Sequence, residues 1–248
     1  MNKVGHVSVG WAVAAAGLFL LPSPLSLVEM AAYMGAATVA SLLPDLDHKT
    51  STASNLVQLP TKYRKLANRL GWVLLACSPI GLMWSVTASI LIFAGGVLAF
   101  CMARLRSLIF IALGLAGILA YWRFDLHWVM ALAGIGFVLL PTVRHRGMIH
   151  SPEFALLLSS GLVLSAANQS LIAQAAVYGM IAGWWSHLAG DIFGRDGIAS
   201  LFWPKLHIAL RLFRNGGSTE RMISLVCSMI TIGLLIGYVV YVFYLSNR

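Results

Sequence analysis

Histidines cluster in a polar turn between Pro141 and Pro152, in a chain that is otherwise mostly apolar. This turn contains His145 and His150. A neutral imidazole nitrogen is the commonest metal donor, and two histidines close in sequence can converge on one ion. Their spacing does not place them on one helical face, so Gly147 must bend the chain if the rings converge. The alternative is a structural turn at a membrane border.

Two further groups of histidine and aspartate follow apolar segments. His187 and Asp191 share one face if their helix continues through Asp191, and such a pair can bind one ion or two neighbouring ones. Alternatively, Asp191 only orients a structural histidine. Asp45, Asp47 and His48 follow a proline that ends the preceding helix. The carboxylates can bridge two cations, or accept a hydrogen bond from a ligating histidine, or simply begin a loop.

Three other charged side chains are candidates for chemistry. Arg144 and Arg146 flank His145, and guanidinium groups suit a phosphate or a carboxylate. Anchoring at the positive side of a membrane is the alternative for both. Glu220 stands at the start of the last helix, where an acid is common, but it can also act as a base or a ligand.

The composition indicates a polytopic, all-α membrane protein with one membrane-embedded domain, residues 1–248. Hydrophobic residues make up 59% of the chain and charged residues 10%, whereas a soluble domain has roughly a quarter charged residues. The positions of lysine and arginine in such a protein indicate how it is oriented in the membrane. The net charge of +9 therefore does not indicate that the protein binds nucleic acid. The three cysteines lie in apolar runs without a CxxC spacing, which supports neither a zinc knot nor a disulfide.

The topology depends on residues 71–103, which are long for one span and short for two. A hairpin turning near residues 85–89 puts four crossings between the Asp45 and His145 loops, so that both lie on one side. It also puts 15 of the 17 lysines and arginines on that side, which the positive-inside bias makes cytoplasmic. We therefore expect a helical bundle of about nine crossings with a cytoplasmic N-terminus. Residues 206–214 are expected to form a helix in the membrane surface.

This topology gathers most of the polar candidates on one face. They are His6, Asp45, Asp47, His48, His145, His150, His187 and Asp191. A catalytic zinc site uses about three protein ligands, so this number favours two or more ions, with some residues orienting the ligands.

Successive motifs resemble the YdjM-like family of membrane-bound, metal-dependent hydrolases, of the LexA-regulated inner-membrane type. The motifs are Gly5-His6, LLPDLDH at 42–48, HRGMIHS at 145–151, SHLAGD at 186–191 and LFWP at 201–204. The resemblance covers roughly 1–70 and 141–230. Shorter members pass nearly directly from the aspartate motif to the HRG motif, so we expect 71–140 to be inserted helices. Ile149 departs from the threonine usual in the family, and residues 192–197 lack its threonine-rich turn.

The resemblance implies metal ligation by Asp45, His145, His150, His187 and Asp191, to which the shared face adds His6. The family is similar to zinc-dependent phospholipase C and single-strand nucleases, which implies phosphoester chemistry. The expected cofactor is therefore two or more divalent ions, zinc being the expected metal.

The sequence thus predicts a hydrolase at the cytoplasmic face of the inner membrane, acting on a phosphoester or lipid-type substrate through metal-bound water. Arg146 would position the anion, and Asp47, His48 and Glu220 complete the catalytic candidates. Expected partners are membrane lipids and a small-molecule or lipid substrate, without nucleic acid; the oligomeric state stays open. The alternative is a non-catalytic metal-binding membrane protein or a transporter. Transport predicts polar residues at mid-membrane depth, whereas these candidates lie at helix ends.

Overall fold

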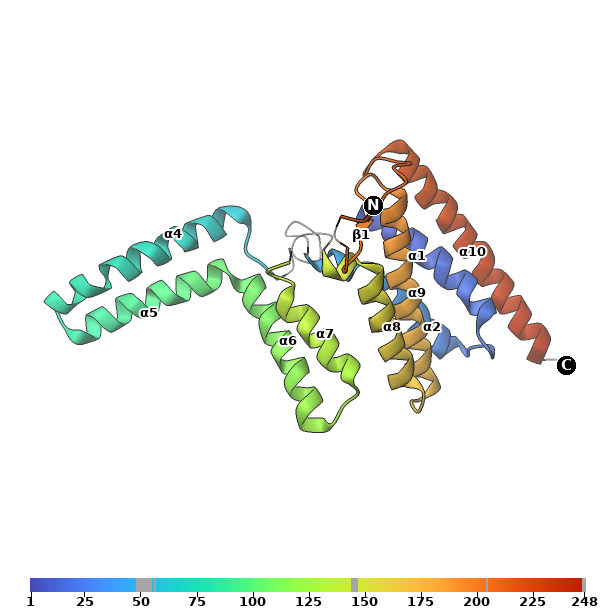
Figure 1. Ribbon diagram of the computed structural model, residues 1–248, viewed down its shortest axis with the longest axis horizontal. Coiled ribbons are helices and arrows are strands. Elements are labelled where there is room, and N and C mark those ends of the chain that lie inside the picture. Colours follow the sequence, from blue (N-terminus) through green and yellow to red (C-terminus); the bar gives the residue numbers. More distant parts are fainter. Residues whose placement is uncertain (48–54, 56, 144–146, 204, 247–248) are drawn as a thin grey trace.

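The computed structural model describes residues 1–47, 55, 57–143, 147–203 and 205–246, and it confirms the all-α class (Figure 1). The described residues form nine α-helices: α1 (Lys3–Gly17), α2 (Leu27–Ala40), α4 (Thr61–Cys77), α5 (Val86–Ala103), α6 (Leu105–Phe124), α7 (Trp128–Leu139), α8 (Pro152–Ala166), α9 (Leu171–Phe193) and α10 (Ser218–Ser246). Short 3-10 turns include η1 (Leu18–Leu20), η2 (Pro44–Asp47), η3 (Ser78–Met83) and η4 (Met148–His150). Strands β1 (Ile198–Ala199) and β2 (His207–Ile208) pair antiparallel.

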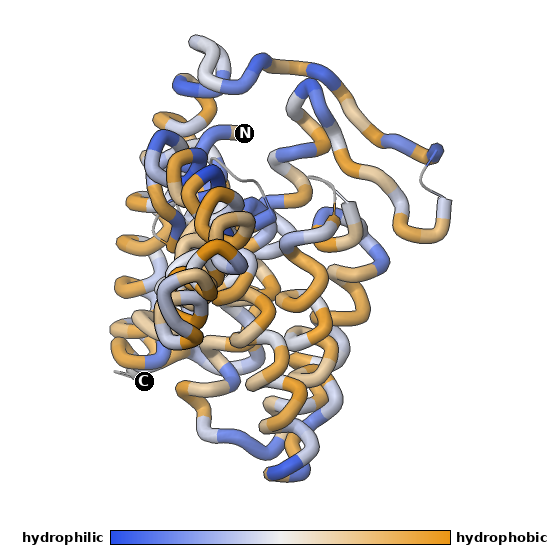
Figure 2. The backbone as a smooth tube through the Cα atoms, turned by 90° about the vertical axis from the view of Figure 1, so that its left-hand side faces the viewer, coloured by the Kyte–Doolittle hydropathy of each residue, from blue (hydrophilic) through white to orange (hydrophobic). Residues whose placement is uncertain are grey.

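Six of the described helices are long and apolar enough to cross a membrane: α1, α2, α4, α5, α6 and α10. Helices α7 and α8 are apolar but shorter. Figure 2 shows hydrophobic residues along the helices and hydrophilic ones concentrated in the turns at their ends. The count of nine crossings and the cytoplasmic N-terminus stay predictions.

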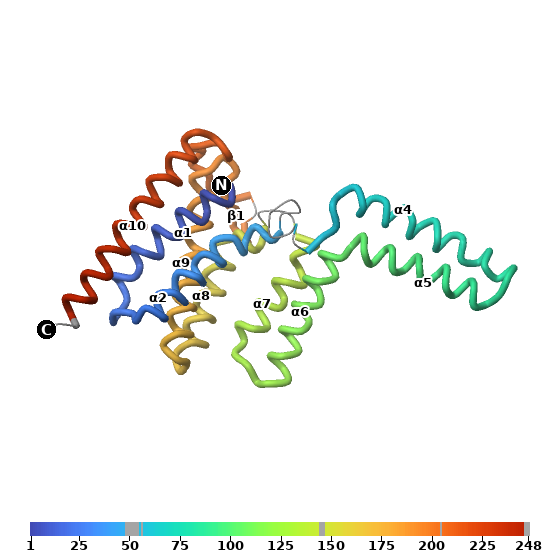
Figure 3. Tube along the Cα trace, turned by 180° about the vertical axis from the view of Figure 1, so that it is seen from behind, coloured from blue at the N-terminus to red at the C-terminus, as the bar shows by residue number. Residues whose placement is uncertain are grey.

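Helix α9 is central to the bundle formed with α1, α2, α8 and α10 (Figures 1 and 3). Small residues on α9 allow α2 to approach closely. A Cβ atom added at Gly179 would lie 2.0 Å from the Tyr33 carbonyl oxygen, and one at Gly183 would lie 2.2 Å from that of Ala37. Association of apolar helices in a membrane depends on such close packing. The two glycines therefore set how α2 and α9 lie against each other.

The chain folds back within 71–103 as the hairpin prediction expected, but the turn lies over residues 78–85 and residues 86–89, which we expected in the turn, belong to α5. Helices α4 and α5 pack side by side and project away from the bundle (Figures 1 and 3). The turn ends at Ser85, whose hydroxyl accepts a hydrogen bond from the Ala88 amide (3.0 Å) and begins α5. Residues 61–70 form the first part of α4.

The prediction of a surface helix over 206–214 was wrong. His207–Ile208 form strand β2, and the following residues dock on the end of α9. The Leu210 and Leu212 amides donate to the carbonyls of Ile192 (2.7 Å) and Phe193 (2.9 Å). Apolar residues alternate with others along this segment, which suits an extended chain. The last carbonyls of α9 have no partner within the helix, so this docking satisfies them.

Helix α8 begins as its sequence indicates. The Ser151 hydroxyl accepts a hydrogen bond from the Phe154 amide (3.2 Å), and Pro152 occupies the first helical position. The preceding turn, η4, presents His150 to the bundle. The start of α8 therefore determines where His150 lies relative to α9.

Candidate metal centre

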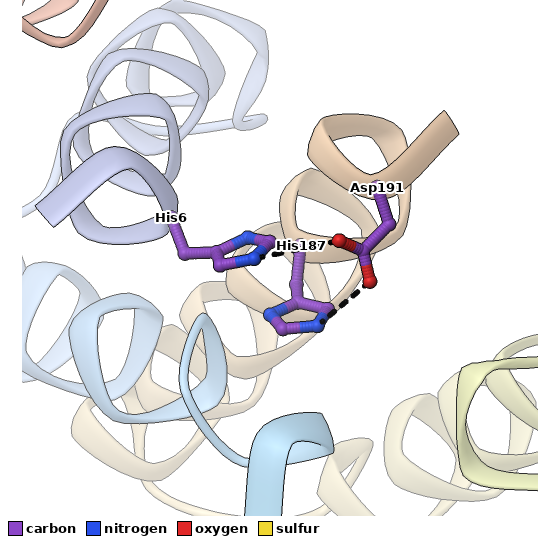
Figure 4. A group of neighbouring side chains, drawn as sticks. All are labelled: His6, His187 and Asp191. Carbon is purple, nitrogen blue, oxygen red and sulfur yellow. Dashed lines mark ion pairs between the residues drawn. The ribbon is translucent and has the colours of Figure 1, made fainter. Parts of the chain in front are cut away.

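The end of α9 supplies His187 and Asp191, which are fully buried. They continue the four-residue spacing of Gly179 and Gly183, so they lie on the face of α9 that packs against α2. The helix runs through Asp191 to Phe193, as the predicted pairing of these two side chains requires. Figure 4 shows both residues together with His6 of α1.

The tautomer of His187 is set by the end of α2. Its Nδ1 lies 2.8 Å from the carbonyl oxygen of Ser41, the residue that caps α2. Because a carbonyl only accepts hydrogen bonds, Nδ1 carries the proton and Nε2 is left as the ring's metal donor. His187 can therefore offer one nitrogen to one ion.

His150 is oriented in the same way by a carboxylate. Its Nδ1 lies 3.3 Å from Oδ2 of Asp47, and both side chains are completely buried. A carboxylate on the far nitrogen of a ligating histidine holds the ring in place and makes Nε2 a better donor. Asp47 thus acts on the centre through His150.

The charge of His150 depends on the neighbouring aspartates. Burial disfavours the charged ring, but Asp45 and Asp47 outweigh burial and raise the pKa of His150 to about 9. Without a metal, His150 is therefore protonated at neutral pH, and it can donate to His187 Nε2. Metal binding at His150 Nε2 must release that proton.

Four donor atoms converge at the centre. The Nε2 atoms of His150 and His187 lie 3.2 Å apart. Asp191 Oδ2 lies 3.4 Å from His187 Nε2 and 3.7 Å from His150 Nε2. Asp45 Oδ1 lies 3.8 Å from His150 Nε2 and 3.9 Å from His187 Nε2.

The separations among His150, His187 and Asp191 fit three corners of a tetrahedral metal site. With bonds of about 2.0–2.3 Å, neighbouring donors of a tetrahedron lie about 3.3–3.8 Å apart. The two histidines and Asp191 come closest to this spacing and are buried, whereas the Asp45 side chain is 25% exposed. Three buried donors and a more exposed fourth can therefore hold a divalent ion that is reached from the side of Asp45.

His6 adds a second group around Asp191. Its ring stacks on that of His187 at 3.8 Å between centroids, and its Nε2 lies 3.6 Å from Asp191 Oδ1 (Figure 4). Both ring nitrogens are buried and make no hydrogen bond with a described residue. His6, His187 and Asp191 also have donor atoms close enough for one ion. Because His187 has only one available nitrogen, the two groups share a ligand.

The sequence of the whole chain matches one known protein family. The family model described as YdjM inner membrane protein matches residues 1–248. The chain belongs to the YdjM inner membrane protein family. No curated protein and no solved structure matches the chain. This YdjM family member is an inner membrane protein with several apolar helices and a buried group of histidines and aspartates able to bind a metal ion. The match includes 71–140, and the idea that these helices are inserted stays a prediction.

The structure brings together six of the residues that the sequence predicted. They are His6, Asp45, Asp47, His150, His187 and Asp191. His48, His145, Arg144 and Arg146 lie outside the described residues. Their predicted roles are therefore neither supported nor opposed by the geometry.

Glu220 belongs to neither group of metal donors among the described residues. It is fully buried between the starts of α1 and α10. One carboxylate oxygen accepts from the Asn2 amide (2.5 Å), and the other accepts from the Gly216 amide. These contacts join the starts of two helices, and the catalytic role of Glu220 stays a prediction.

Sequence reasoning missed Ser41 and Arg106. Ser41 acts through its main-chain carbonyl, for which no side-chain pattern exists. Arg106 is buried in the first turn of α6 and donates to the carbonyls of Leu46 (2.5 Å) and Asp47 (3.1 Å). The feature of the sequence that could have identified Arg106 is an arginine in the first turn of an otherwise apolar helix. Its contacts tie the turn that presents Asp45 and Asp47 to α6.

Proposed function

We propose that this YdjM family member is a metal-dependent hydrolase of phosphoesters. His150, His187 and Asp191 would hold a divalent ion, and the partly exposed Asp45 stands beside the fourth position, which is left for water. The observation that supports this is the unequal burial of the four donors. A structural zinc site is closed by four protein ligands, whereas a catalytic site has three and an accessible fourth position.

When bound in this position, a divalent ion would lower the pKa of water and stabilise negative charge on a phosphoryl oxygen. The residues of the chain prepare the site for this chemistry. Asp47 and the Ser41 carbonyl hold the two rings with Nε2 inward, and Asp45 is placed to take a proton from water entering on its exposed side. Arg146 stays the predicted partner of the phosphate.

A second ion stays part of the proposal. Asp191 directs Oδ2 to His150 and His187, whereas its Oδ1 lies 3.6 Å from His6 Nε2 and accepts a hydrogen bond from the Met1 ammonium group (3.0 Å). A second ion between His6 and Asp191 would have to displace that ammonium group from Oδ1. His48 and His145 are the further donors that the sequence predicts there. Zinc is the proposed metal because histidine and carboxylate donors at tetrahedral spacing suit it.

Metal analysis of the purified full-length protein tests the site. We expect at least one equivalent of divalent metal, lost in His187→Ala and retained in the matched variant His127→Ala. His127 caps the start of α7 and belongs to neither group of metal donors. Less than one equivalent in the unaltered protein would contradict the proposal, as would full retention in His187→Ala.

Hydrolysis of bis(p-nitrophenyl) phosphate and of phospholipids, with and without a chelator, tests catalysis. Asp45→Asn should retain metal, because the three buried donors remain, but it should lose most turnover, because the exposed carboxylate that takes the proton from water is gone. Full metal content without turnover on any of these substrates would instead support a non-catalytic metal-binding protein.

A further inference from the structure

An apolar cavity of about 120 Å³ lies beside the metal centre. Its walls come from α7, α8, α9 and the turns η2 and η4. Every lining side chain is hydrophobic, including Leu46, Ile149, Phe154 and Trp184. A cavity of this character stays dry and accepts hydrocarbon rather than water.

The cavity and the metal centre share three elements. Turn η2 contributes Leu46 to the cavity and its neighbour Asp45 to the centre. Turn η4 contributes Ile149 to the cavity and His150 to the centre. On α9, Trp184 lines the cavity one turn before His187. A molecule in the cavity therefore has its nearer end beside the donor atoms.

The cavity extends from the centre along the bundle. On α7 its lining runs from Leu140, next to the polar turn, back to Ala133, which is roughly 10 Å of helix. On α9 it runs from Trp184 back to Met180, away from His187. The polar centre thus lies at one end of an apolar cavity that follows the helices, which is how a lipid lies in a bilayer.

We propose that the cavity binds the hydrocarbon chain of a lipid phosphoester whose phosphate lies at the metal centre. The proposal rests on the proposed function, and it defines the substrate class of that site as lipid rather than soluble phosphoesters. A slightly larger engineered cavity accepts benzene, so this one accommodates roughly four or five carbons. The rest of a longer chain continues among the surrounding lipids.

The cavity affects which substrate is bound more than how tightly that substrate is bound. Bilayer hydrocarbon is as apolar as the cavity wall, so entering the cavity gains little from leaving the bilayer. Its effect is to place the phosphate against the donors. Filling the cavity would therefore act by excluding the chain sterically, so that the phosphate is no longer placed against the donors.

A photo-crosslinking experiment tests the proposal on the full-length protein in phosphatidylcholine nanodiscs. The probe is dodecyl phosphate with a diazirine in the middle of its chain. We expect crosslinks to the walls contributed by α7 and α8. Gly136→Leu should reduce them about tenfold. A Cβ atom at Gly136 meets only Phe154, at 3.5 Å, so the new side chain enters the cavity without a backbone clash.

Gly35→Leu is the matched control, because a Cβ atom there meets nothing within 4 Å. It should leave the crosslinks unchanged. Ala133→Leu is a second filling variant from the same wall if Gly136→Leu does not fold. Metal content is measured on every sample, and dodecanol with the same diazirine tests whether labelling requires the phosphate.

The outcomes separate the two proposals. Normal metal content with cavity crosslinks that persist in the filling variants would overturn the lipid-chain proposal alone. Equal cavity labelling by the dodecanol probe would also overturn it, because the phosphate would then not place the chain. Less than one equivalent of metal in the unaltered protein would refute the proposed function.

Discussion

Replacing Asp47 by asparagine should weaken metal binding about tenfold without removing a ligand. Asp47 Oδ2 lies 3.3 Å from Nδ1 of His150, and both side chains are buried. A hydrogen bond to a charged group contributes about 1.5–3 kcal/mol, against about 0.5–1.5 kcal/mol between neutral groups. The asparagine carbonyl still accepts, so the loss is the difference, about 1–1.5 kcal/mol. This corresponds to about tenfold in Kd.

Competition with a chromogenic chelator measures this Kd on the purified protein. The stoichiometry should stay at that of the unaltered protein, whereas Asp191→Asn, which changes a ligand, should bind metal much more weakly. Asp125→Asn is the matched control. Asp125 ends α6 in a left-handed conformation, φ 49°, which asparagine also tolerates.

An unchanged Kd in Asp47→Asn would refute the assignment of Asp47 as the residue that orients His150. An equal loss in Asp125→Asn would show that removing any aspartate has the same effect, and it would refute the reasoning as well. The comparison therefore separates a local effect at His150 from a general effect of charge.

The remaining predictions concern the supports of the centre. Gly183→Ala should cost about 1–3 kcal/mol of stability and lower the metal content, because its Cβ would lie 2.2 Å from a carbonyl oxygen of α2. Gly35→Ala should change neither the stability nor the metal content. Thermal unfolding and metal analysis measure the two effects. Arg106→Met should weaken metal binding about tenfold by releasing the carbonyls of η2, and an equal effect of Arg123→Met, at the far end of α6, would contradict this. Glu220→Gln should lower the unfolding temperature while metal content stays unchanged, because one main-chain amide loses its acceptor; loss of metal instead would place Glu220 in the centre.

The tertiary structure alone decided how the donors divide their roles. Asp45 and Asp47 are two residues apart in one turn, yet only Asp45 faces both Nε2 atoms, while Asp47 lies behind His150. Sequence spacing cannot distinguish them, because the direction of each side chain depends on the 3-10 turn and on Arg106, which holds it from another helix. The Ser41 carbonyl that sets the tautomer of His187 has no signal in the sequence, since every residue has a carbonyl. The extended segment after β2 was also a tertiary result, because the end of α9 offered hydrogen-bond acceptors that a surface helix would have left unsatisfied.

The sequence by itself determined the class of protein and most of the donors. Long apolar runs with few charges require membrane helices, whose main-chain groups are satisfied within each segment, so the all-α class did not depend on packing. The spacing of His187 and Asp191 placed both on one face of α9. Convergence with Asp45 and His150 depended on helices far apart in the chain. It required the close approach of α2 to α9, which only the packed structure shows.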